Sequence, residues 1–181
     1  MKEGIFLEGE RVILRPLAAG DVEGNYVSWL NDPAVNAHNS HHVFPYTRAQ
    51  ALNYVESVSA DTHNLVLAMV AKDSGTHIGN ISLQKIDPIS KTGEFAILIG
   101  EKEYWGKGIA TEAARLLLRH GFQTLNLHRI YCGTSSTNTA MQKLAKTLGM
   151  KQEGVRREAQ YKNGAYADTI EYGLLKDEFA V

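Results

Sequence analysis

The sequence predicts an α+β fold in which helices flank a mixed, mostly antiparallel central sheet. Apolar runs of strand length, separated by short turns, recur along the chain, as residues 64–72 and 77–85 illustrate. A long run with helical spacing of its apolar residues follows a glycine-rich turn near residue 106. Near the end, Asn163-Gly164, the strongest short hairpin signal in the chain, lies between two more strand-like runs. The resulting order of elements is β-α-α-β-β-β-α-β-α-β-β.

Composition bounds the class of protein. The 181 residues are most simply one domain spanning residues 1–181, with 44% hydrophobic and 22% charged residues as in soluble globular proteins. A net charge of −1 leaves no basic footprint for nucleic acid. The single Cys132 excludes an intramolecular disulfide and suits a reducing compartment. No signal peptide and no run of membrane-spanning length is recognisable, so we expect a cytoplasmic protein without a membrane partner.

The first third of the chain predicts one strand and two helices. Residues 10–16 have the pattern of a strand that Pro16 ends. A helix is expected over residues 21–30, closed by Asn31-Asp32-Pro33. A second helix is expected over residues 47–59, because Thr47-Arg-Ala-Gln50 has the form of a capping box.

The rest of the chain alternates strands and helices around the glycine-rich turn. Strands 64–72 and 77–85 form a hairpin, and strand 93–100 leads into the turn. Thr111-Glu112 then opens a long helix. Its apolar positions share one face: Ala110, Ala113, Ala114, Leu117, Leu118, Gly121 and Leu125. The elements expected after it are a strand over 128–134, a helix over 137–148 closed by Gly149, and the two strands around Asn163-Gly164.

The glycine-rich turn, residues 105–111, has the properties of a phosphate-binding loop. It feeds a helix start, where unpaired backbone N–H groups and the positive end of the helix dipole favour an anion. A Walker A loop is excluded, since Lys107 is followed by Gly108 and not by Ser or Thr. A dinucleotide fingerprint is excluded too, because the acidic residue expected about 20 positions on is absent. An ordinary glycine-rich turn remains the alternative.

The segment Trp105-Gly-Lys-Gly108-Ile-Ala110 resembles the acyl-CoA signature R/Q-x-x-G-x-G/A of the GNAT acetyltransferases, with Trp105 departing at the first position. The form Tyr-Trp-Gly-Lys-Gly is similar to the RimJ/RimL-type branch, which acetylates protein N-termini. The resemblance covers essentially the whole chain and implies the GNAT fold, with acetyl-CoA as cosubstrate and no metal. It also implies that strand 96–99 splays from its parallel neighbour, which frees backbone groups for the cosubstrate. The implied cosubstrate-binding residues are Ile97, Leu98, Ile99, Trp105, Gly106, Lys107, Gly108, Ile109, Ala110, Thr111 and Asn138.

An amine acceptor must be deprotonated before it attacks. At pH 7 this costs about 4.6 kcal/mol for a lysine-like amine, whose pKa is near 10.4, and about 1 kcal/mol for an α-amine near 7.7. Glu94, at the start of the central strand, is the candidate base, and similar enzymes often carry a Glu there. The alternative is a solvated strand-end carboxylate. Asn80 on the neighbouring strand is a candidate to orient the amine or a water, and is equally explicable as a plain polar strand residue.

The leaving thiolate must be reprotonated, and here the chain departs from its relatives. The helix from Asn138 resembles the family pattern N-x-x-A-x-x-L-Y-x-K-x-G-F, but Ala145 stands where many relatives have the acid Tyr. Met141 stands where some RimL-type enzymes have a Ser. Tyr161, water, or unaided departure of a thiol with a pKa near 8.5 are the alternatives. A covalent route through Cys132 is set aside, since a lone Cys in a strand is usually a core residue.

The acceptor site is expected between residues 29 and 46. This segment lacks periodicity and carries His38, His41, His42, Phe44 and Tyr46, which suit a pocket better than a metal site because no acidic or thiol partner lies nearby. The candidate acceptor-binding residues are Trp29, His41, His42, Asn80 and Tyr161.

Two functions from different classes fit these patterns. The first is an acetyl-CoA-dependent N-acetyltransferase that transfers acetyl directly to a primary amine, either a protein N-terminus or a small molecule such as an amino sugar or polyamine. The second is a non-catalytic acyl-CoA sensor, which the missing Tyr at Ala145 favours. A homodimer is a further expectation.

Overall fold

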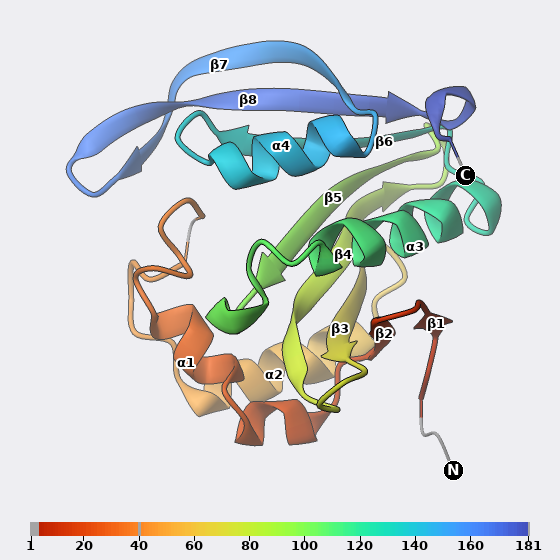
Figure 1. The fold of residues 1–181 in the computed structure, drawn as a ribbon. Helices are drawn as coiled ribbons and strands as arrows, with labels where there is room; N and C mark the ends of the chain where they lie inside the picture. Colours follow the sequence, from red (N-terminus) through yellow and green to blue (C-terminus); the bar gives the residue numbers. More distant parts are fainter. Residues whose placement is uncertain (1–3, 40, 181) are drawn as a thin grey trace.

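The computed structural model describes residues 4–39 and 41–180, and its centre is one eight-stranded sheet (Figure 1). The strand order is β1-β2-β3-β4-β5-β6-β8-β7, and every pair is antiparallel except β5–β6. The strands are β1 (Leu7–Glu8), β2 (Val12–Pro16), β3 (Leu65–Ala71), β4 (His77–Asp87), β5 (Thr92–Ile99), β6 (Arg129–Ser135), β7 (Lys151–Lys162) and β8 (Ala165–Leu175). The α-helices are α1 (Tyr26–Asn31), α2 (Arg48–Ser59), α3 (Ile109–Gln123) and α4 (Thr139–Thr147). The expected α+β architecture is therefore confirmed.

Two hydrophobic clusters lie on opposite faces of the sheet. The larger one joins the sheet to α3 and α4, and the smaller one joins it to α1 and α2. Alternate residues of β5 divide between them, since Phe95 is buried in the first and Leu98 packs against the second. We call the α1–α2 side of the sheet the α1–α2 face.

The local signals that were read from the sequence explain most of the helices. Thr47 caps α2 through the expected capping box with Gln50. The buried residues of α3 recur at helical spacing, and its N-cap is Gly108 with a left-handed φ of 78°. This helix starts at Ile109, two residues before the expected Thr111-Glu112 opening. The turn Asn163-Gly164 has positive φ at both residues and closes the β7–β8 hairpin as predicted.

The ladder between β5 and β6 is short. It pairs Thr92–Glu94 only with Arg129–Tyr131, after which β5 stays bonded to β4 and β6 to β8. The two strands diverge beyond Glu94 (Figure 1). This confirms the expected splay of residues 96–99 and opens a slot in the middle of the sheet.

The prediction of one continuous helix over residues 21–30 is wrong. A 3₁₀ turn, η1 (Ala19–Glu23), is separated by Gly24 and Asn25 from the short α1. Asp21 explains the break, because its carboxylate accepts the Ala18 N–H at 2.8 Å and binds the Arg15 guanidinium, which holds a tight turn.

Two smaller differences lie in the sheet. The two-residue strand β1 was not expected, and β4 runs past residue 85 to Asp87 through an irregular register. None of the helices in the described ranges is long and apolar enough to span a membrane.

Candidate active site

The glycine-rich turn is held open by its own backbone and fixed from outside by Arg11. Gly106 and Gly108 have φ of 71° and 78°, which only glycine adopts without strain. Arg11, directly before β2, donates through Nη1 to the Lys107 carbonyl at 2.9 Å and through Nε to Glu112 at 2.9 Å. The backbone N–H of Arg11 also donates to the Glu112 carboxylate. The turn and the first turn of α3 are thereby tied to β2, a clamp between residues far apart in the sequence.

The side chains of the turn also fix its position. The Trp105 indole N–H donates to the Ile99 carbonyl at 2.9 Å, which ties the turn to the end of β5. The Lys107 ammonium lies 5.5 Å from the centre of the Tyr104 ring, a cation–π contact. The backbone N–H groups of Ile109 and Ala110 begin α3 directly after Gly108 and have no earlier helical carbonyl to bind. The arrangement suits an anion at the start of α3.

The slot between β5 and β6 lies beside this helix start. Ile97 and Ile99 pack toward the α3–α4 cluster, and Leu98 packs toward the α1–α2 cluster. Asn138 follows the end of β6, where its side chain accepts the Met141 N–H and caps α4. The Trp105–Ile99 hydrogen bond joins the turn to the end of β5, whereas Asn138 has a structural role of its own.

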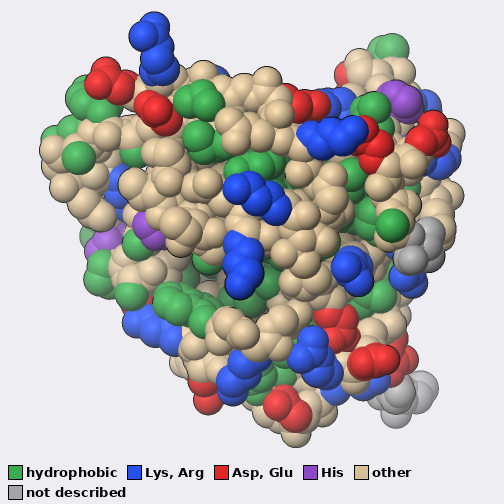
Figure 2. Space-filling model, turned by 45° about the horizontal axis from the view of Figure 1, so that its top comes forward, with side chains coloured by type: hydrophobic (Ala, Val, Ile, Leu, Met, Phe, Trp, Pro, Cys, Tyr) green, Lys and Arg blue, Asp and Glu red, His purple; other side chains and the backbone are tan. Residues whose placement is uncertain are grey.

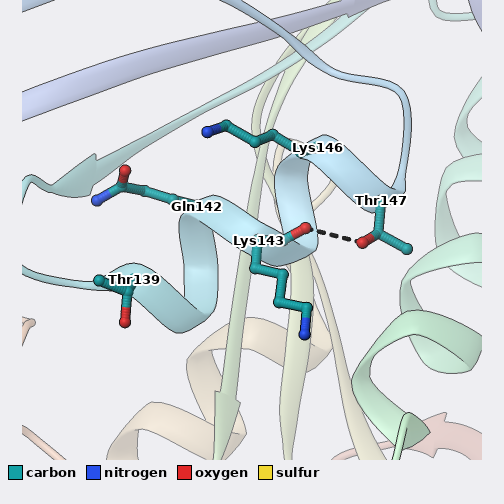
Figure 3. A pocket seen from close by; sticks show the side chains of 5 residues that line it. All are labelled: Thr139, Gln142, Lys143, Lys146 and Thr147. Carbon is teal, nitrogen blue, oxygen red and sulfur yellow. Dashed lines mark hydrogen bonds between the residues drawn. The ribbon is translucent and has the colours of Figure 1, made fainter.

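Sequence analysis missed a group of cations on α4. Lys143 and Lys146 line a hollow together with Thr139, Gln142 and Thr147 (Figure 3). Thr147 donates to the Lys143 carbonyl at 2.9 Å within the helix. Lys and Arg side chains also stand near the middle of the molecular face that carries α4 (Figure 2). The spacing of the two lysines, three residues apart on one helix, was the signal that could have identified them.

Glu94 lies where the parallel ladder ends. It is the last β5 residue paired with β6, opposite Tyr131, and its Oε2 lies 2.7 Å from the Lys85 Nζ. Its side chain is 25% exposed, so it is more enclosed than a solvated strand-end carboxylate. The Glu94 carboxylate therefore lies where β5 and β6 separate, and the alternation along β5 places it on the α1–α2 face. Its partner is the Lys85 ammonium.

Asn80 belongs to a buried polar network. Its Oδ1 lies 2.9 Å from Nε2 of His77, whose other ring nitrogen lies 3.4 Å from the Asp21 carboxylate. Since Asn80 Oδ1 and the Gly79 carbonyl can only accept, Nε2 carries the proton. Burial lowers the pKa of His77, against the opposite influence of Asp21, so the ring is neutral at pH 7. Asn80 is thus oriented by the His77 ring, which lies beside the Arg15–Asp21 ion pair.

Trp29 is a core residue. It is 4% exposed, packs edge-on against His77 with ring centres 4.9 Å apart, and donates through Nε1 to Glu101 at 3.0 Å. A Cβ on Gly100 would fall 1.9 Å from the indole, so the glycine after β5 makes room for it. Trp29 therefore holds α1 against the end of β5 and presents almost no surface to an acceptor.

His38, Asn39 and His41 tie the described parts of the segment from 33 to 46 to β7 and to the turn after β6. Lys162 donates to the carbonyls of Asn39 and His41 at 2.9 and 2.6 Å, and His38 Nδ1 lies 3.1 Å from the Thr137 hydroxyl. Partial burial and the Lys162 ammonium lower the pKa of His41. His42 is exposed with a left-handed φ of 61°. The structure thus brings His41 and Lys162 together, a contact that the sequence did not indicate.

Tyr161 and Cys132 were both considered for chemistry. Tyr161 is 64% exposed near the end of β7 and contacts Tyr166 in a tilted arrangement, with ring centres 4.9 Å apart. Cys132 is fully buried, and burial raises the pKa of its thiol to about 12. Ala145 is buried in the α3–α4 cluster. Among residues 4–39 and 41–180, no three His, Cys, Asp or Glu side chains are grouped to hold a metal ion.

Comparison with known proteins agrees with this geometry. The family model of the GNAT acetyltransferase domain matches residues 11–151. The uncharacterized N-acetyltransferase p20 of Bacillus licheniformis is 29% identical over 94% of this chain and 96% of its own. The spermidine N(1)-acetyltransferase of Escherichia coli K12 is 31% identical over 61% of this chain and 59% of its own.

A solved structure shares the fold over nearly the whole length. The GNAT-family acetyltransferase of Bacillus anthracis superposes with a TM-score of 0.83 at 25% identity, covering 96% of this chain and all of the other. The family match spans most of the described chain, including the splayed strands and the glycine-rich turn. The protein therefore belongs to the GNAT acetyltransferase family and is an acetyl-CoA-dependent acyltransferase.

Proposed function

We propose that the protein transfers acetyl from acetyl-CoA directly to the primary amine of a small molecule or a protein N-terminus. The observation that carries this proposal is the end of the β5–β6 ladder at Glu94, on the strand whose other end leads into the glycine-rich turn. A carboxylate, a slot with free backbone groups and an anion-binding helix start thus follow one another along β5 and the turn after it. A small-molecule acceptor has the stronger support, because a relative over about three-fifths of the chain is a spermidine acetyltransferase.

In this proposal the cosubstrate lies along the slot. Residues 97–99 of β5 bind the pantetheine arm through backbone groups, and the turn from Trp105 to Thr111 binds the pyrophosphate. Lys143 and Lys146 on α4 supply further positive charge for the phosphates. Asn138 contributes by capping α4 at the edge of the slot.

Glu94 takes the proton of the attacking amine. The amine nitrogen bonds to the acetyl carbon, the carbon–sulfur bond breaks, and the electron pair leaves with the CoA thiolate. Ala145 and Met141 carry no hydroxyl, so we propose that the thiolate leaves unaided and is protonated by water, which its ordinary pKa near 8.5 allows. The raised thiol pKa of Cys132 supports direct transfer over a covalent acetyl-enzyme.

A thiol-release assay with a panel of amines tests the enzyme against the sensor. The proposal predicts acetyl-CoA-dependent CoA release that requires an amine and yields the acetylated amine by mass spectrometry. Acetyl-CoA binding without release on any amine would assign the protein to the sensor class instead.

The finer assignments rest on the sequence. We propose membership of the RimJ/RimL-like branch from Tyr104-Trp-Gly-Lys-Gly108, and one domain over residues 1–181, which the single continuous sheet supports. A cytoplasmic location and a homodimer complete the proposal, together with the absence of a metal, nucleic-acid or membrane partner.

A further inference from the structure

Strand β4 carries a bulge that brings Lys85 to Glu94. Gln84 pairs with Glu94 and Asp87 with Thr92, so Lys85 and Ile86 together oppose the single residue Gly93. Ile86 packs against the α3–α4 cluster, while the Lys85 ammonium reaches Glu94 at 2.7 Å. Without the extra residue, Lys85 and Gln84 would point to opposite faces of the sheet.

The bulge is built into the fold. Lys85 has a left-handed φ of 48°, a conformation that is costly for any residue with a Cβ. Its N–H donates to Asn64 Oδ1 at 3.0 Å, and the Ile86 N–H donates to the His63 carbonyl at 2.8 Å. Strain of this kind persists where the surrounding structure imposes it, and bulges next to active sites re-aim side chains.

A second ion pair joins β7 to β8, the strand next to β6. Arg156 Nε is 2.6 Å from Glu171, whose carboxylate lies over Gly133, two residues beyond Tyr131. Both cations are largely exposed, at 71% for the Lys85 side chain and 66% for that of Arg156. Both carboxylates are more enclosed, at 25% for Glu94 and 28% for Glu171.

These charges disfavour a polycation. An acceptor with several ammonium groups would have to displace Lys85 and Arg156 from their carboxylates, with no anion of its own to receive them. Lys162 binds the carbonyls of Asn39 and His41, and so adds a third cation beside the segment expected to bind the acceptor. An acceptor that carries both an ammonium and an anion meets a partner for each charge.

We propose that the acceptor is an α-amino acid, whose ammonium binds Glu94 and whose carboxylate binds Lys85, with Arg156 as a second cation. The 2.7 Å ion pair places the two protein charges side by side, so the two charges of the acceptor must also be close together, as they are in an α-amino acid. The exposed Lys85 side chain can turn outward to admit the ligand between the pair. This inference rests on the proposed function and makes Lys85 a specificity-determining residue.

The experiment compares matched acceptors in the thiol-release assay. The probes are the protein amino acids, their α-amides and spermidine, assayed with wild-type protein, Lys85→Met, Lys85→Arg and Lys91→Met. Lys91 lies in the turn of the same β4–β5 hairpin and serves as the control. For the best amino acid, kcat/KM should exceed that for its amide and for spermidine by about tenfold or more, the range for one hydrogen bond to a charged group.

The variants distinguish binding of the acceptor carboxylate by Lys85 from a general loss of activity. Lys85→Met should raise the KM for the amino acid about tenfold, with a smaller change for the amide, whereas Lys85→Arg and Lys91→Met should resemble wild type. A preference for the amide or spermidine, or an equal effect of Lys85→Met on acid and amide, overturns the inference while leaving the proposed function intact. Absence of CoA release with every amino acid overturns the inference, and only absence of release across the wider amine panel overturns the proposed function.

Discussion

Among single residues, Glu94 is the one placed to act as a base, because it is the last β5 residue of the parallel ladder and lies where the slot begins. Replacing it by Gln keeps its size and removes its ability to take a proton. We expect Glu94→Gln to lower kcat/KM by about 10²–10⁴ at pH 7 for an acceptor with a high amine pKa. The loss should shrink as pH rises, since the amine then deprotonates in water. A pH series of initial rates measures this, with Glu56→Gln on the exposed side of α2 as the control. An unchanged rate at pH 7 would remove Glu94 from the catalytic role.

Protonation of His77, which packs on the α1–α2 face, is expected to lower the stability of the fold at low pH. It is buried between Asp21, Asn80 and Trp29, with Arg15 behind Asp21, and burial lowers its pKa below the ordinary value near 6.5. The unfolded chain therefore binds the proton first as pH falls, so the contribution of the neutral ring is complete above pH 6.5 and is lost below it.

We expect the free energy of unfolding of the wild type to fall between pH 7 and 5.5, with part of that loss due to His77. His77→Gln should lack this part, while the decline due to His41 and His120, whose pKa values are also lowered, remains. Urea unfolding at the two pH values gives the comparison, and the exposed His63→Gln is the control. Equal pH slopes for wild type and His77→Gln would contradict the assignment.

At the scale of elements, the glycine-rich turn and the start of α3 form the proposed anion site. Gly108→Asp adds a like charge beside the pyrophosphate and a Cβ at a left-handed φ of 78°. We expect acetyl-CoA affinity to fall tenfold or more, which is about 1.4 kcal/mol. Calorimetric titration measures it, and Gly108→Ala separates backbone strain from charge. Wild-type affinity of Gly108→Asp would show that the phosphates bind elsewhere.

The anchored segment from 33 to 46 is the element expected to choose the acceptor. Replacing His41 and His42 by Ala should raise the acceptor KM while leaving acetyl-CoA affinity nearly unchanged, because neither residue belongs to the turn proposed to bind the phosphates. Steady-state kinetics together with calorimetry test both constants. A double variant with the wild-type acceptor KM indicates that these are solvated surface histidines without a role in binding.

For the whole molecule, local signals predicted the fold class and most elements, but not the contacts between distant parts. The helix over 21–30 failed because Asp21 binds Arg15 and the Ala18 N–H, a tertiary effect that helical spacing does not reveal. Trp29 was placed in the acceptor site because no local pattern shows that Gly100 makes room for its indole.

The parts of the site that one continuous segment forms could be predicted from the sequence, and the parts that need contacts between distant segments could not. The glycine-rich turn is one continuous segment, so its sequence alone predicts it. The Arg11 clamp, in contrast, joins Arg11 to Glu112, 101 positions away in the sequence. The bulge at Lys85 depends on Asn64 and His63 from another part of the chain. The splay itself follows from strand pairing, which the resemblance implied and the register confirms.

Two-substrate initial-rate kinetics test the central claim, direct acetyl transfer within the slot between β5 and β6, most directly. Rates would be measured over a grid of acetyl-CoA and amine concentrations, with the best acceptor from the amine panel. Direct transfer requires both substrates bound together, so the double-reciprocal lines should intersect, and the protein recovered after acetyl-CoA alone should carry no acetyl group by intact mass. Parallel lines with an acetylated protein would contradict the account, because they mark a covalent acetyl-enzyme on the route.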